Sequence, residues 1–77
     1  SLSNQPLSSM PKGRKVRLNA IVGGRGLNRR LLSLGISLGS EFEIITHQRM
    51  GVVLARDGNR VALGTGIAQK LMVEAID

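Results

Sequence analysis

Cysteine, tryptophan and tyrosine are absent from this 77-residue sequence, and Phe42 is its only aromatic residue. Without cysteine the chain can form neither a disulfide nor a thiolate metal site. Small barrels that bind single-stranded nucleic acid stack bases on aromatic side chains, so this composition disfavours that mode of binding. It also excludes the aromatic-lined groove that binds proline-rich peptides.

Long apolar runs are missing as well, because no stretch approaches the roughly 18 residues of a membrane span. No signal-peptide pattern opens the chain, so we expect a cytoplasmic location. Residues 1–9 are rich in Ser, Asn, Gln and Pro and start with Ser1 rather than Met. We expect them to be a flexible lead-in, partly cloning-derived, before a single domain at residues 10–77.

Acidic side chains are lacking from the first half, since all five lie at or after Glu41, while the net charge is +6. Seven of the eleven basic residues precede Glu41. Such a cationic block attracts phosphate, an anionic membrane or an acidic partner, although a solvated face is the plain alternative. The seven residues are Lys12, Arg14, Lys15, Arg17, Arg25, Arg29 and Arg30.

Signatures of catalysis and metal binding are weak. His47 is the only histidine, and no ligand-spaced pair such as H-x-x-x-H occurs. The hydroxyl residues have no identifiable base beside them, so we expect no catalytic residue, no enzyme activity and no cofactor. His47 with Glu43 is the best candidate for weak transition-metal binding, and an exposed strand histidine is the alternative.

The stretch GGRGLNRR, residues 23–30, begins like a phosphate loop. Gly24 and Gly26 fit G-x-G-x-x-G, but the third glycine position is Arg29, and a Walker sequence is absent. We therefore expect these glycines to turn a strand into a helix.

Short alternating segments predict strands at residues 15–22, 41–48, 52–56, 60–63 and 71–76, with a hairpin turn at Asp-Gly-Asn 57–59. Leucine spacing predicts a helix over 27–34, ended by Gly35, and Thr65 can cap a helical turn at 65–69. The sequence therefore predicts a mainly β fold: a small five-stranded barrel with a short helix after the first strand and a helical turn before the last.

One side of the predicted helix carries Leu27, Leu31 and Leu34, which we expect to face the core. Leu32 lies about 140° from Leu27 on the helical wheel, away from that stripe. It is either an interface anchor or a side chain covered by the lead-in through Leu2 or Leu7.

Five segments follow one another between Leu7 and Glu74: LSSMPKG, KVRLNAIVGG, RRLLSLGISLGSEFEII, VVLARDGNRVAL and IAQKLMVE. In their order and spacing they resemble FeoA, a family of small accessory proteins of bacterial ferrous iron transport. The resemblance implies a Src-homology-3-like barrel and a non-enzymatic adaptor or regulator. A departure is Gly64-Thr65-Gly66, where the family usually has charged residues that start a helix.

The resemblance also implies a partner, the membrane transporter FeoB, whose cytoplasmic part carries a GTP-binding domain and could recruit the chain to the inner face of the membrane. We predict contact through Arg25, Asn28, Arg29 and Leu32, with self-association as a further possibility. The alternatives are a basic nucleic-acid-binding domain, an accessory domain of the iron-dependent-repressor type, and a regulator that supplies Arg25 or Arg29 to a partner's GTPase site.

Overall fold

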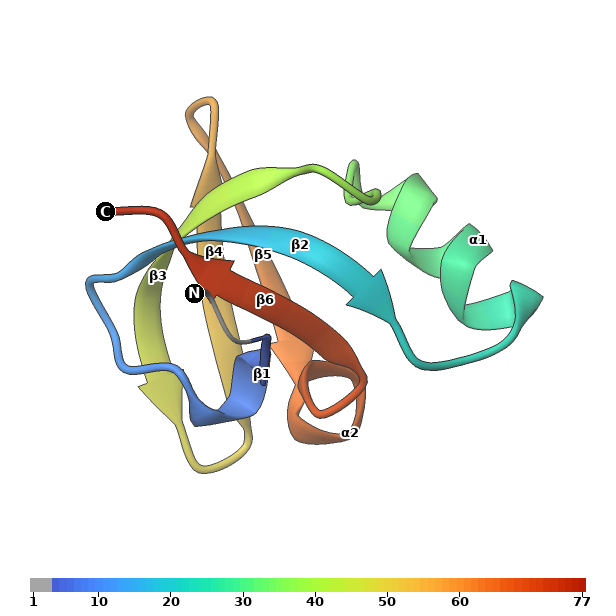
Figure 1. The fold of residues 1–77 in the computed structure, drawn as a ribbon, viewed down its shortest axis with the longest axis horizontal. Helices are drawn as coiled ribbons and strands as arrows, with labels where there is room; N and C mark the ends of the chain where they lie inside the picture. The colour runs from blue at the N-terminus through green and yellow to red at the C-terminus, as the bar shows by residue number, and fades with distance from the viewer. Residues whose placement is uncertain (1–3) are drawn as a thin grey trace.

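The computed structural model describes residues 4–77, and six antiparallel strands form a single curled sheet (Figure 1). The strand order is β1-β6-β2-β3-β4-β5, and the outer strands β1 and β5 are not paired with each other, so the barrel stays open at this seam. The mainly β prediction is confirmed. The strands are β1 (Gln5–Pro6), β2 (Lys15–Ile21), β3 (Glu41–Gln48), β4 (Gly51–Arg56), β5 (Asn59–Gly64) and β6 (Leu71–Ala75).

The core lies inside the curl of the sheet and follows from the alternation in each strand. Val16 and Leu18 of β2 are fully buried, and Phe42, the lone aromatic residue, is 4% exposed. The rest of the core comes from the other strands and from the segments that join them. These residues are Leu7, Met10, Leu31, Ile36, Ile44, Val52, Leu54, Leu63, Ala68, Leu71 and Val73.

The amino-terminal segment differs from the expected lead-in. Gln5 and Pro6 form β1 and pair with Val73 and Met72 of β6, and a 3₁₀ helix, η1 (Leu7–Ser9), follows. Leu7 is fully buried, because a core this small gains from each apolar side chain it can enclose. Pro6 is tolerated since β1 is an edge strand. Leu2 lies outside the described residues.

The helix α1 (Arg25–Ser33) begins two residues before the predicted start and ends as a Schellman motif. Gly35 has a φ of +82°, which the predicted left-handed position requires. Its N–H donates to the Leu32 carbonyl, and the Ile36 N–H donates to the Leu31 carbonyl. The chain therefore reverses before Leu34 can face the core: Leu34 is 40% exposed, contrary to expectation, and Ile36 is buried in its place.

The β4–β5 hairpin lies where it was predicted, but its turn has two residues, Asp57 and Gly58, whose φ angles are +50° and +83°. Asn59 of the predicted turn already belongs to β5. The helical turn before the last strand is α2 (Thr65–Ala68). Thr65 does not cap it. Gly64 holds the N-cap position, and the Thr65 hydroxyl donates instead to the Arg49 carbonyl at 3.1 Å.

Candidate partner-binding face on α1

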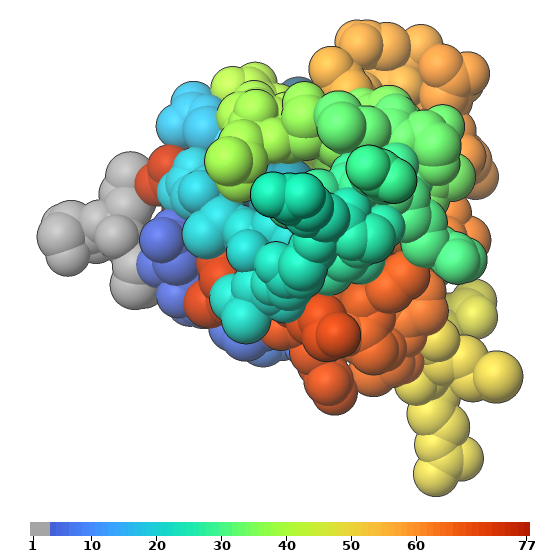
Figure 2. Space-filling model, turned by 90° about the vertical axis from the view of Figure 1, so that its right-hand side faces the viewer, coloured from blue at the N-terminus to red at the C-terminus, as the bar shows by residue number. Residues whose placement is uncertain are grey.

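The four residues predicted to contact a partner all lie on the exposed side of α1. Arg25, Asn28 and Arg29 are exposed, and Leu32 is 61% exposed. Figure 2 shows α1, in teal to green, lying across the front of this side of the molecule. Leu7 is buried in the core and does not cover Leu32, which removes one explanation for an apolar side chain at this position.

The charge of α1 is not balanced by nearby acids. Among residues 4–77, Arg25, Arg29 and Arg30 form no ion pair. The helix also has no acidic residue of its own. Its positive charge is therefore available to an outside partner.

Four of the five acidic side chains pair with arginines that lie outside α1. Arg17 bridges Glu41 of β3 and Glu74 of β6, each at 3.2 Å, because β2 runs between these two strands. At the β4–β5 turn, the Arg56 Nε lies 3.7 Å from the Oδ2 of the next residue, Asp57.

The remaining pair joins Arg14 to Asp77 at 2.9 Å. The hydrogen bond from the Arg14 guanidinium lowers the pKa of the Asp77 carboxyl, and the Lys15 backbone N–H lowers it further. Figure 1 shows the carboxyl end of the chain on the side opposite α1. The ion pairs of Arg14 and Arg17 thus leave α1 as a separate cationic region.

An open hollow of about 350 Å³ lies between α1, the end of β2 and the turn after α1. We call it the α1 hollow. Leu32 forms part of it, and Leu38, 63% exposed, forms another part. Leu38 was not among the predicted contact residues. Its only signal was an apolar residue in a short segment between two glycines, Gly35 and Gly39. The lining residues are Ile21, Asn28, Leu32, Ile36, Ser37 and Leu38.

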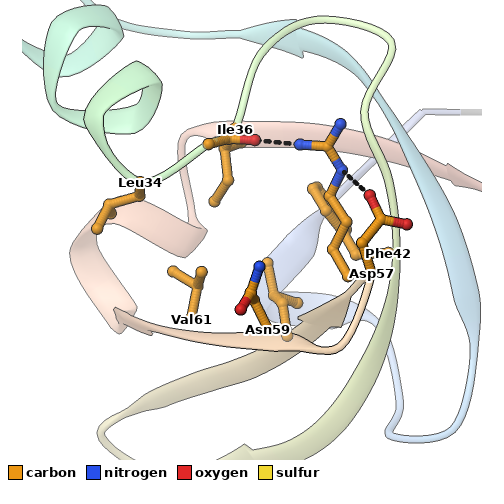
Figure 3. Close-up of a pocket in the computed structure, with 9 residues that line it drawn as sticks. Leu34, Ile36, Phe42, Asp57, Asn59 and Val61 are labelled. Atoms are coloured by element: carbon orange, nitrogen blue, oxygen red, sulfur yellow. Dashed lines mark hydrogen bonds and ion pairs between the residues drawn. The ribbon is translucent and has the colours of Figure 1, made fainter.

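A second, smaller cavity of about 100 Å³ lies between the end of α1 and the β4–β5 hairpin (Figure 3). The Arg56 guanidinium donates to the Gly35 carbonyl and closes one side of it. This bond connects the hairpin to the end of α1. None of the four predicted contact residues lines the cavity. It is lined by Leu34, Gly35, Ile36, Phe42, Leu54, Arg56, Asp57, Asn59 and Val61.

The candidate metal residues His47 and Glu43 both lie exposed on β3. Glu43 is opposite Lys15 and Ala55 on the flanking strands, and His47 is opposite Val52. Within residues 4–77, no group of three His, Asp or Glu side chains gathers in the way a metal site requires. Binding through these two residues therefore stays a prediction.

No helix in the described part of the chain is long and apolar enough to cross a membrane. A sequence model described as the FeoA domain matches residues 5–75. The chain is 38% identical over 69 residues to a curated protein of Methanocaldococcus jannaschii. That relative is named, provisionally, Fe(2+) transport protein A. The match covers 90% of this chain and 84% of the relative.

Solved structures show the same fold. A crystal structure of the iron uptake regulatory protein FeoA has a TM-score of 0.87 at 31% identity and covers 95% of this chain and 99% of its own. An NMR structure of an FeoA-like protein from Clostridium acetobutylicum has a TM-score of 0.83 at 23% identity, covering 97% and 90%. A manganese-dependent transcriptional repressor in complex with manganese has a TM-score of 0.89 at 25% identity, covering 95% of this chain and 37% of that protein.

The fold is thus Src-homology-3-like, the class of small β domain shared by iron transport accessory proteins and metal-dependent repressors. The chain belongs to the FeoA family of ferrous iron transport accessory proteins. The resemblance seen in the sequence is confirmed.

Proposed function

We propose that this protein is a non-enzymatic adaptor that docks on the cytoplasmic domain of a FeoB-type ferrous iron transporter through the outer face of α1. The observation that carries this proposal is Leu32, 61% exposed on a helix whose arginines have no ion-pair partner among the described residues. An exposed leucine held on a regular helix can anchor an interface, and the arginines increase the rate of encounter with an acidic surface. The protein would then work in the cytoplasm beside the membrane.

The test is binding of the purified cytoplasmic domain of the same organism's FeoB-type transporter, measured by calorimetry. The double variant Arg29→Ala/Leu32→Ser should bind at least about tenfold more weakly, since loss of a central interface side chain costs more than about 1 kcal/mol. Its melting temperature should match the wild type, because both side chains are exposed.

A matched control removes one exposed arginine and one exposed apolar side chain elsewhere. Arg60→Ala/Met50→Ser does this on β5 and on the loop between β3 and β4, where Met50 is 84% exposed. This control should bind like the wild type. Equal affinities for the wild type and the α1 double variant would remove α1 as the docking face.

The uncompensated arginines also favour a second candidate, non-specific binding of nucleic acid through phosphate contacts. This function predicts binding to generic DNA or RNA that weakens steeply as salt is raised. Phe42 is 4% exposed, so no aromatic side chain is available to stack with a base. An absence of any mobility shift at about 50 mM salt would discard this candidate.

A further inference from the structure

We propose that the α1 hollow receives one apolar side chain from an acidic segment of the partner protein, with Leu38 as a second anchor opposite Leu32. This inference rests on the proposed function and specifies the chemistry of the partner segment. Leu32 comes from the helix and Leu38 from the turn that follows it, and both line the same hollow while remaining more than half exposed.

The turn that carries Leu38 is held firmly. The Gly39 N–H donates to the Leu18 carbonyl at 2.8 Å, and the Leu18 N–H donates to the Ser40 carbonyl at 2.8 Å. Ser40 is itself buried, and its hydroxyl accepts from the Ser37 N–H at 3.0 Å. Leu38 is therefore exposed on an ordered turn, and binding would lose little conformational entropy there.

The mainly apolar lining of the hollow favours an inserted apolar side chain. Ile21 and Ile36 contribute to its apolar lining, and Asn28 and Ser37 are its polar members. A concave apolar site is filled by a side chain inserted from a folded partner. A flat lipid surface would leave this concavity unfilled, which disfavours a membrane as the occupant.

The charge around the hollow selects an acidic partner over a second copy of the chain. Asn28 and Leu32, which line it, alternate along α1 with Arg25 and Arg29, and these arginines form no ion pair among the described residues. Two copies of the chain, each with a net charge of +6, repel each other. Carboxylates beside the inserted side chain would instead pair with the arginines.

The test compares two leucine variants of the full chain. Leu38→Gln changes a side chain that lines the hollow, whereas Leu34→Gln changes one that is 40% exposed and lines the second cavity instead. Against the transporter's cytoplasmic domain, Leu38→Gln should lower the affinity at least about tenfold, and Leu34→Gln less than about twofold. Equal effects of the two changes would overturn the inference while leaving the docking proposal in place.

A second arm tests the partner chemistry without the transporter. The probes are a short peptide with one leucine among glutamates and aspartates, the same peptide with serine for leucine, and vesicles rich in phosphatidylglycerol. The wild type should bind only the leucine peptide, more weakly at higher salt, and Leu38→Gln should abolish this. Peptide binding without transporter binding would refute the docking proposal alone. If the wild type binds neither the leucine peptide nor the vesicles, the inference is overturned. Leu38-dependent binding to the vesicles alone would overturn it as well.

Discussion

At the scale of single residues, two adjacent leucines of α1 have opposite environments. Leu31 is fully buried, and Leu32 is 61% exposed. The 100° step between neighbouring helical residues turns one toward the sheet and the other toward solvent. This difference could be predicted from leucine spacing alone, because it depends only on the helical period.

Replacing each leucine with alanine should therefore have unequal effects on stability. Leu31→Ala should lower the free energy of unfolding by about 2–5 kcal/mol, since it removes buried contacts and leaves a cavity. Leu32→Ala should change it by less than about 0.5 kcal/mol. Urea denaturation of both variants measures the difference, and equal losses would place Leu32 in the core.

The ion pair of Asp77 predicts how the stability of the protein depends on pH. The pKa of Asp77 is lowered in the folded protein, so its ionised form contributes stability above the ordinary carboxyl pKa of about 3.9. That contribution is lost as the pH falls through the lowered pKa. Arg14→Gln removes the main cause and should move the carboxyl titration, followed by NMR, to a higher pH. The same titration curve in both proteins would show that Arg14 does not act on Asp77.

At the scale of elements, the sequence pattern located the five longer strands within one residue of the observed ends. It missed β1, because a two-residue strand shows no alternation and is defined only by its pairing with Val73 and Met72. The pattern also failed to predict that Leu34 is exposed. The leucine spacing extends to Leu34, but α1 ends at Ser33, where the Schellman motif reverses the chain.

The glycines of the strands and of the helix should respond differently to substitution. A Cβ on Gly51 would lie 2.2 Å from the Leu63 carbonyl oxygen, which belongs to the paired strand β5 and cannot move alone. Gly51→Ala should therefore lower the free energy of unfolding by about 1–3 kcal/mol.

Gly26 is the matched control for this change. It lies in the first turn of α1, and nothing lies within 4 Å of a Cβ built on it. Gly26→Ala should leave stability unchanged or raise it by up to about 1 kcal/mol, because alanine favours the helix. A loss of melting temperature in Gly26→Ala as large as that in Gly51→Ala would contradict this comparison.

The candidate face was only partly predictable. The arginines and Leu32 follow from one helical segment, whereas the hollow joins Ile21, Leu32 and Leu38 from three segments of the chain. No local pattern relates those three residues. Their proximity depends on how the turn after α1 is bonded to β2 through Leu18, which only the folded structure reveals.

At the scale of the whole molecule, charge and exposed apolar surface coincide at one end. Four of the five acids pair with Arg14, Arg17 or Arg56, while the arginines of α1 form no ion pair among residues 4–77. The same helix exposes Leu32, and the turn after it exposes Leu38. A small domain with a modest core can maintain this arrangement because both exposed leucines lie on hydrogen-bonded backbone. We therefore expect a partner to bind at this end of the molecule.

The most direct measurement is an NMR titration of the isotope-labelled protein with the unlabelled cytoplasmic domain of the FeoB-type transporter. Backbone amide signals of Arg25, Arg29, Leu32 and Leu38 should shift or broaden first, and those of His47 and Met50 should stay in place. Changes confined to the β3–β4 hairpin, with the α1 signals unmoved, would contradict the account.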